Sequence, residues 1–188
     1  MGNHRPRCPV RLTIASLACI AGASCATMTE SECLEADWHS VGVRDGTRGR
    51  PLEHLERHRE ACMATGVIPD VEQYKKGRGW GLGRYCTTRS GLSEGRLGRD
   101  YENVCPPMLE PDFLRGYQLG SAIYDVNSDI GWHTSQIAMF EEGLESRDDV
   151  TEKERREVSE FLQTLEADLR KLRERLDQLE RRAAGMPQ

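Results

Sequence analysis

The fold is decided by the stretch FLRGYQLGSAIYDVNSDIGWHTSQIAMFEEGL, residues 113–144 of a 188-residue chain. Apolar side chains recur in it alternately four and three residues apart, the spacing of a helix that buries one seam. A second run with the same spacing follows a polar break at 147–150. The two seams are formed by Leu119, Ile123, Val126, Ile130, His133, Ile137, Phe140 and Leu144, and by Val158, Leu162, Leu165, Leu169, Leu172, Leu176 and Leu179.

Two long helices joined by a short polar turn fold back on each other and bury one seam against the other. Thr151 and Glu154 have the spacing of a capping box, so the second helix is expected to begin there. We therefore predict an antiparallel, coiled-coil-like helical hairpin over 108–184 and a disordered tail over 185–188. Each arm would be about 50 Å long. An intermolecular coiled coil is the alternative, which the equal arms and the turn disfavour.

The start of the first arm repeats a pattern that occurs 39 residues earlier. An aromatic residue, two glycines and a tyrosine follow one another three, four and four residues apart. The two copies are Tyr74, Gly77, Gly81 and Tyr85, and Phe113, Gly116, Gly120 and Tyr124. On a helix this spacing puts both glycines on one stripe, so that another backbone can approach closely. We expect the two stripes to face each other and to hold the hairpin against the rest of the protein.

The remainder of the chain is predicted to be helical, because it is poor in aromatic and β-branched residues. Capping boxes at Thr29–Glu32 and Asp70–Gln73 would open two of its helices. Gly42 is expected to end the first of them, and a glycine-rich loop is expected around 91–98. The fold class is therefore all-α, with a small disulfide-bonded, Cys/Gly-rich helical body over 32–107 ahead of the hairpin.

Residues 1–24 are predicted to be a secretory signal peptide. Three arginines precede an apolar run at 12–23, which small residues close. That order is typical of export signals, and the run is shorter than the roughly 20 residues that span a bilayer. The stretch AGASC, residues 21–25, resembles the lipobox of bacterial lipoproteins, in which the cysteine becomes the lipidated N-terminus. We expect lipid attachment at Cys25, with ordinary signal cleavage after Ala23 as the alternative.

Such processing would place the protein at the outer membrane, facing the periplasm, with 25–31 as the tether to the lipid anchor. It removes three arginines and no acidic residue, so the net charge changes from −5 to −8. Four cysteines then remain in an oxidising compartment: Cys33, Cys62, Cys86 and Cys105. Four cysteines imply two disulfides, with three possible connectivities. A zinc site is disfavoured, because no Cys-x-x-Cys pair is present.

Three motifs could carry chemistry, and each has a plainer explanation. The sequence GLSEG at 91–95 matches the nucleophile elbow of serine hydrolases, but no alternating strand–helix pattern surrounds it. His54 and His58 are four residues apart, a spacing that can chelate a metal, but their neighbour Cys62 is expected in a disulfide. His133 is expected to be a packed histidine of the seam, with a pH-sensitive seam as the alternative. We predict no catalytic residue, metal or cofactor.

The strongest binding signal is a local excess of positive charge. Between 74 and 99 there are seven basic residues and one acidic residue, with Trp80 among them. Such a patch could bind an anionic envelope polymer, lipid head groups or an envelope protein, whereas export argues against nucleic acid. A solvated surface without a partner is the alternative. The basic residues are Lys75, Lys76, Arg78, Arg84, Arg89, Arg96 and Arg99.

One further set of residues carries a resemblance to a known family. Its members are Glu32-Cys33, Asp37-Trp38, Gly42, Asp45-Gly46, His58, Cys62, Tyr74, Gly77-Arg78, Gly81-Leu82, Tyr85-Cys86, Gly95, Gly98, Tyr101, Cys105-Pro106, Phe113, Tyr117 and Gly120. This set resembles bacterial envelope lipoproteins grouped as domain of unknown function 2799, from about Glu32 to the end of the chain. The resemblance implies a lipobox, four paired cysteines and a helical tail, and no activity.

For the disulfides we predict Cys33 with Cys62, joining the first two helices, and Cys86 with Cys105, closing the glycine-rich loop. The function expected from the whole sequence is a non-enzymatic structural or interaction lipoprotein of the cell envelope. The alternatives are a small-ligand or metal-binding envelope protein and, in third place, an envelope hydrolase.

Overall fold

The computed structural model describes residues 27–186, all of whose regular structure is helical. The predicted signal peptide and Cys25 lie outside these residues. The elements are α1 (Glu30–Leu34), α2 (Trp38–Thr47), α3 (His54–Ala61), the 3-10 turn η1 (Met63–Thr65), α4 (Val71–Tyr85), α5 (Thr88–Arg96), α6 (Glu110–Glu145) and α7 (Glu152–Ala184). This confirms the predicted all-α class. Within the described range, no helix combines the length and the apolar character that a membrane crossing requires.

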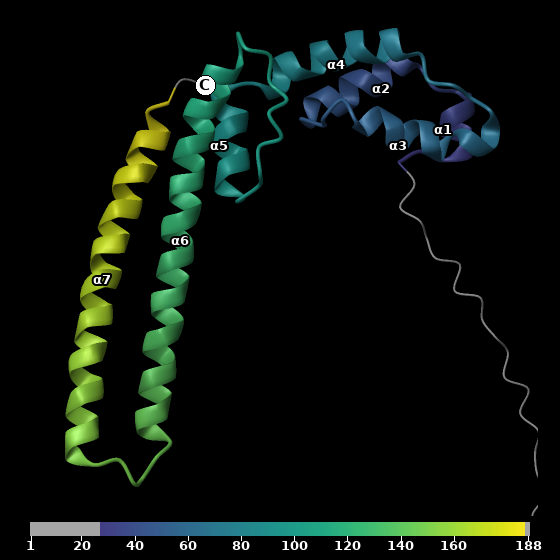
Figure 1. Cartoon of the computed structure of the whole chain (residues 1–188). Coiled ribbons are helices and arrows are strands. Elements are labelled where there is room, and N and C mark those ends of the chain that lie inside the picture. The colour runs from purple at the N-terminus through teal and green to yellow at the C-terminus, as the bar shows by residue number, and fades with distance from the viewer. Residues whose placement is uncertain (1–26, 187–188) are drawn as a thin grey trace, which may run out of the picture.

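The molecule is bent, with two parts that meet near the start of α6 (Figure 1). Helices α6 and α7 lie side by side as a long hairpin, and α5 packs against the base of α6. Helices α1 to α4 form a smaller body that extends sideways from that base, with α4 on its upper side and α3 on its lower side in this view. The predicted body and hairpin are therefore linked through α5, which packs on the hairpin itself.

Helices α2 and α4 approach each other until their backbones touch. Gly42 and Gly46 of α2 and Gly77 and Gly81 of α4 lie at the contact, and all four are buried. A Cβ atom added at Gly42 would overlap the carbonyl of Tyr74, and the other three would likewise overlap backbone of the opposite helix. Only glycine allows this separation, so these four positions fix how the body is packed.

Helices α5 and α6 repeat that arrangement. Gly91 and Gly95 of α5 face Gly116 and Gly120 of α6, and a Cβ at any of the four would overlap the opposite backbone. The expectation that the stripes of α4 and α6 face each other is therefore wrong. The stripe of α4 faces the glycines of α2, and the stripe of α6 faces the glycines of α5. For the same reason Gly42 lies inside a helix rather than at its end, and the predicted loop at 91–98 is mostly helix.

The two helix pairs are copies of one structural unit. Residues of α2 correspond to those 49 positions later in α5, and residues of α4 to those 39 positions later in α6. Gly49 and Gly98 follow the first helix of each pair with φ of 64° and 62°, and each covers a tyrosine ring from the second helix, Tyr85 or Tyr124. We call 33–85 the first unit and 86–124 the second unit.

Equivalent hydrogen bonds support this correspondence. In the first unit the Arg78 side chain donates to the carbonyl of Arg50, with Nε and O 2.9 Å apart. In the second, the hydroxyl of Tyr117 donates to the carbonyl of Arg99 at 2.8 Å. The donors Arg78 and Tyr117 are 39 residues apart, and the acceptors Arg50 and Arg99 are 49 residues apart. These are the same offsets that relate the helices of the two units. The two units therefore share their backbone contacts even where the side chains differ.

Each unit contains one disulfide. Cys33 is bonded to Cys62 and Cys86 to Cys105, the pairing predicted from the sequence, with Cα atoms 5.5 and 5.7 Å apart. In both units the bond ties the segment before the first helix to the loop between the two helices. It therefore closes the loop that brings the two glycine-bearing helices together.

The hairpin is well packed at its base and less so beyond it. Val126 of α6 and Leu165 of α7 are buried, but from 127 to 164 every residue is half-buried or exposed. His133, predicted on the seam, is half-buried, and its Nδ1 lies 2.9 Å from the carbonyl oxygen of Asp129. The predicted capping box at Thr151 is present and opens α7.

A pair of glycine substitutions in α4 tests the backbone contact. Gly77→Ala puts a methyl group into the backbone of α2, so we expect a large loss of stability, of about 3 kcal/mol or more. Gly79→Ala is the matched control, because nothing lies within 4 Å of a Cβ there. Alanine should stabilise the helix at that position by about 0.5–1 kcal/mol. Urea unfolding of both variants measures this, and equal effects would contradict the packing described.

Candidate functional site

Three buried polar side chains meet in the first unit: Asp45 of α2, His58 of α3 and Tyr74 of α4. The Nε2 atom of His58 lies 2.7 Å from Oδ2 of Asp45, and the hydroxyl of Tyr74 donates to the same oxygen at 2.8 Å. Their exposed fractions are 2%, 1% and 0%. On its other side, His58 has Nδ1 2.9 Å from the hydroxyl of Thr27. The cluster thus ties three helices and the start of the described chain together.

The hydrogen bonds orient the imidazole of His58. The Asp45 carboxyl is ionised, so Nε2 of His58 carries the proton that lies between the two groups, and Oδ2 of Asp45 accepts it. On the other side of the ring, Nδ1 pairs with the hydroxyl of Thr27, which also lies 3.1 Å from the carbonyl oxygen of Arg57. The carboxylate is therefore buried and accepts hydrogen bonds from both His58 and Tyr74.

The pKa shifts in the cluster agree with this assignment. Burial by itself raises the pKa of Asp45, but the hydrogen bonds from His58 and Tyr74 and the charge of His58 together outweigh it. The pKa of the Asp45 carboxyl is therefore lowered, and the carboxyl stays ionised. Burial, together with the hydrogen bond to Asp45 and the charge of Asp45, raises the pKa of the Tyr74 phenol. Tyr74 therefore remains a hydrogen-bond donor.

A metal site is the alternative to a purely hydrogen-bonded cluster at this place. Asp45, His54 and His58 offer three ligand atoms that lie within 4.8 Å of one another. A metal could bind only if His58 lost its Nε2 proton and its hydrogen bond to Asp45. Cys62 contributes no ligand, because it is in a disulfide. Among the described residues, every buried side-chain polar atom already has a hydrogen-bond partner, so the cluster is complete as a structural network.

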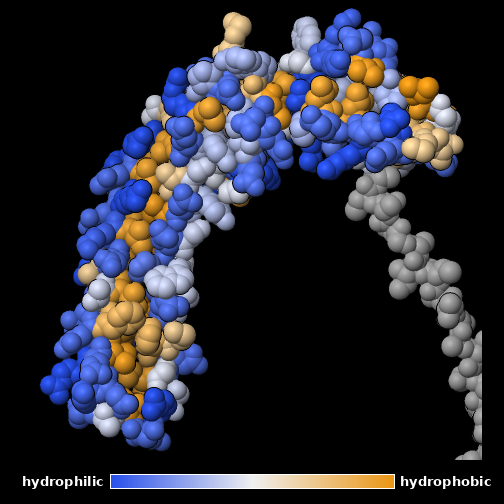
Figure 2. Space-filling view, in the orientation of Figure 1, coloured by the Kyte–Doolittle hydropathy of each residue, from blue (hydrophilic) through white to orange (hydrophobic). Residues whose placement is uncertain are grey.

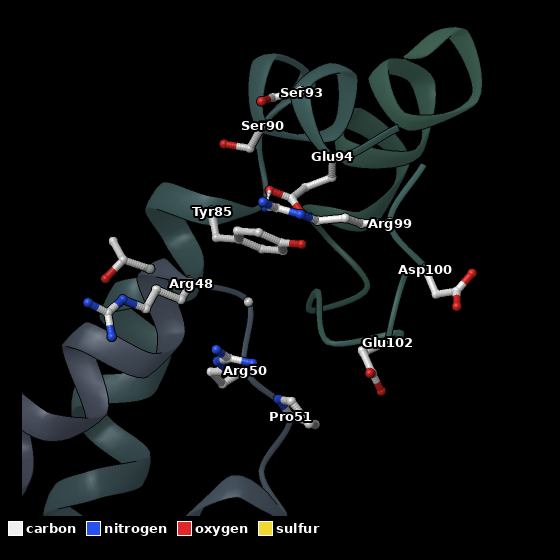
Figure 3. A pocket seen from close by; sticks show the side chains of 12 residues that line it. Arg48, Arg50, Pro51, Tyr85, Ser90, Ser93, Glu94, Arg99, Asp100 and Glu102 are labelled. Carbon is white, nitrogen blue, oxygen red and sulfur yellow. Dashed lines mark hydrogen bonds and ion pairs between the residues drawn. The ribbon is translucent and has the colours of Figure 1, made fainter. Parts of the chain in front are cut away.

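A cleft of about 690 Å³ lies where the two units meet (Figure 3). It is lined by the segment after α2, including Arg50, and by residues of the second unit, including Glu94 and Arg99. Arg99 and Glu94 form an ion pair at 3.2 Å, and in Figure 3 the ring of Tyr85 lies next to this pair. Burial and then the charge of Glu94 raise the pKa of Tyr85 to about 12. The cleft therefore carries charges of both signs that largely neutralise each other.

The serine of the GLSEG motif also lines this cleft. Ser93 lies within α5, whose glycines at 91 and 95 pack on α6. A nucleophile elbow needs a strand-to-helix turn, and residues 27–186 contain no strand. The glycines of the motif are therefore explained by helix packing rather than by hydrolase chemistry.

The seven predicted basic residues lie on α4, on α5 and in the segment that follows α5. Four of them are engaged by neighbours: Lys75 pairs with Glu72, Arg78 donates to a backbone carbonyl, Arg96 pairs with Glu180 of α7, and Arg99 pairs with Glu94. Arg89 lines a separate cleft between α5 and α6. Lys76 and Arg84 remain as exposed residues of α4, with Trp80 between them at 73% exposure. Lys76, Trp80 and Arg84 thus form a short exposed row on one helix, and binding of an anionic partner stays a prediction.

Asp45 was not predicted as a site residue from the sequence. The internal duplication is the signal that could have identified it. Its counterpart in the second unit is Glu94, so an acidic side chain occupies the same place in both units. In the first unit α3 brings His58 to this acid. The second unit has a shorter connection without such a helix, and Glu94 pairs with Arg99 near the surface.

Removal of the buried charge should be costly. Asp45→Asn removes the buried carboxylate that accepts from His58 and Tyr74, so we expect a loss of about 3 kcal/mol near neutral pH. Glu94→Gln is the matched control at the equivalent place, and its pair with a largely exposed Arg99 contributes less than about 1 kcal/mol.

The same comparison has a pH dependence. The pKa of Asp45 is lower in the folded protein than in the unfolded chain. Its contribution to the free energy of unfolding is therefore complete above the unfolded pKa, and it is lost as the pH falls through the folded pKa. The stability difference between wild type and Asp45→Asn should therefore shrink below about pH 4. Chemical unfolding at several pH values measures it, and a difference independent of pH would contradict the buried carboxylate.

Metal binding has a simple test. Because the cluster is already satisfied, we expect equimolar Zn²⁺, or EDTA in excess, to leave the melting temperature unchanged. A rise of several degrees with Zn²⁺ that disappears in His54→Ala would show a metal centre instead.

Comparison with known proteins gives one match. A family model described as "Protein of unknown function (DUF2799)" matches residues 37–122. No curated protein and no solved structure matches the chain. The matched range begins at the cap of α2 and ends about a third of the way along α6, so it covers the glycine contacts of both units and leaves out the distal hairpin. It is shorter than the range expected from the sequence. The similarity to DUF2799 therefore lies in these two units, within residues 37–122.

Proposed function

We propose that this protein is a non-enzymatic interaction module of the cell envelope and that the α6–α7 hairpin is its contact arm. One observation carries the proposal: the apolar seam of the arm is only partly covered by its own two helices. From 127 to 164 every residue is half-buried or exposed, and Figure 2 shows a hydrophobic stripe along the hairpin between hydrophilic flanks. Stripes of this length on a folded protein commonly mark a surface that another molecule covers.

Large side chains beside the seam extend this surface. Trp132, Met139 and Phe161 are 55%, 54% and 45% exposed. Near the tip, Met139 and Phe140 line an apolar groove of about 340 Å³ that also includes Val150. Two helices alone cannot cover both sides of such a seam, whereas a further amphipathic helix laid in the groove would bury it. The arm therefore has the form of a helix-binding surface.

The polar chemistry of the body supports a non-enzymatic role. Asp45 and Tyr74, whose pKa values are shifted, are buried and hydrogen-bonded to each other, so they present no reactive atom to a substrate. The cleft between the units contains a charge pair and a tyrosine whose pKa is raised to about 12, which leaves its phenol protonated. Neither place combines an activated nucleophile with a base.

The proposed location rests on the sequence of residues 1–25, with a lipid at Cys25 and the module facing the periplasm from the outer membrane. The described chain begins at Thr27, whose hydroxyl is bonded to α3. Two residues span at most about 7 Å, so a lipidated Cys25 would hold the body close to the membrane. A short tether suits a protein that presents an arm at a fixed distance from its anchor.

Site-specific photo-crosslinking in intact cells tests the arm. A photoreactive amino acid in place of Met139 should give a discrete crosslinked product, because that side chain lies at the groove. The same substitution at Arg156, which is also exposed near the tip but outside the groove, is the control and should give none. No product at Met139, or equal products at both positions, would refute the contact arm.

A further inference from the structure

A row of three side chains follows one flank of α4. Lys76, Trp80 and Arg84 are four residues apart, so they lie one above another on the helix. All three are exposed, and Trp80 has 73% of its surface in solvent. A tryptophan is rarely left this open, since burial of its ring is worth several kcal/mol (about 25 cal/mol per Å² over 150–250 Å²). Packing within the protein therefore does not explain why a tryptophan occupies position 80.

The backbone beside this row is bare. Gly79 and Gly83 would place a Cβ with nothing within 4 Å, unlike Gly77 and Gly81, which contact α2. Each costs the helix about 1 kcal/mol relative to alanine, although a side chain at either position would meet open space. Without side chains at these two positions, a bound molecule can lie flat against α4 next to the indole ring.

The charge of the row is opposite to that of the protein. The chain has a net charge of −5, yet Lys76 and Arg84 flank Trp80. Lys75, which pairs with Glu72, is a third cation nearby. A positive row on an acidic protein attracts anions locally while the rest of the surface repels them. A guanidinium and an ammonium on either side of a flat aromatic ring suit a ligand that has both ring-shaped apolar faces and carboxylates.

The position of α4 favours a polymer over the anchoring membrane. The described chain begins on the lower side of the body in Figure 1, below α1 and α3, whereas α4 forms the upper side. An anchor at Cys25 would attach the body to the membrane on this lower side, opposite α4. Lipid head groups of the same leaflet would then lie away from the row.

From these observations we propose that Lys76, Trp80 and Arg84 bind a carboxylate-bearing glycan of the cell wall. The indole stacks on a sugar ring, and the two cations pair with carboxylates on either side of it. The inference rests on the proposed envelope location. It gives the module two contacts, the arm for a helical partner and α4 for the wall.

Co-sedimentation with purified cell-wall sacculi tests the proposal on the full-length protein in detergent. We expect the wild type to sediment with sacculi, with binding that weakens as salt rises. Trp80→Ala should weaken it about tenfold or more, as for a central aromatic contact. Lys76→Glu with Arg84→Glu should abolish it. The matched control, Lys153→Glu with Arg156→Glu, makes the same charge change near the tip of the hairpin and should bind as the wild type does.

All these side chains are exposed, so the variants should melt with the wild type, and melting curves check this. Equal binding by wild type and Trp80→Ala, or equal loss in the control pair, would overturn the proposal. So would binding to anionic vesicles but not to sacculi, which would identify a lipid surface. Loss of binding to sacculi in the wild type, together with a crosslinked product at Met139, would refute the glycan site alone. Binding to sacculi without a crosslinked product at Met139 would refute the contact arm alone.

Discussion

Contact between helix backbones is the constraint on which the rest of this structure depends. In each unit four glycines let two helices touch along their main chains, a separation at which a single added methyl group would overlap backbone atoms. Such a contact has little freedom to slide, because backbone atoms cannot change rotamer as side chains do. It fixes the direction of α4 in the first unit and of α6 in the second. The disulfide in each unit closes the loop that leads from one helix to the other.

The two copies use this common frame differently. In the first unit, the longer connection includes α3, which adds His58 to the acid at position 45 and seals a buried polar core. In the second unit, the connection is shorter and the second helix continues far beyond the contact as one arm of the hairpin. The equivalent acid, Glu94, stays near the surface. The first unit therefore supplies a rigid base, while the second sets the direction in which the arm leaves it.

The sequence was sufficient to predict what depends on local spacing. The seams of α6 and α7, the capping box at Thr151 and the two disulfides follow from residue type and distance along the chain. The glycine pattern of α4 and α6 was also visible, but its partners were predicted wrongly. A stripe of glycines indicates that some backbone approaches closely, without specifying which one. Gly42 and Gly91 were read as breakers, which is what glycine indicates when its tertiary contact is unknown.

The site was harder to predict because its parts are distant in sequence. Asp45 and Tyr74 are 29 residues apart, and Arg96 finds its acidic partner 84 residues later, in α7. A run of basic residues indicates local charge, whereas the helix rotation and these distant acids decide which cations remain exposed. Helix periodicity groups Lys76, Trp80 and Arg84 on one flank, but only the packing of α4 on α2 shows that this flank is open.

The two glycine-packed units form the stable core, and the arm beyond Val126 is held mainly by its own helices. Hydrogen exchange of the backbone amides, measured along α6 in the purified protein, tests this division of stability. We predict strong protection where α6 contacts α5, and exchange faster by orders of magnitude beyond Val126. Uniform protection along the whole of α6 would contradict it, because the seam would then be as well packed as the glycine contacts.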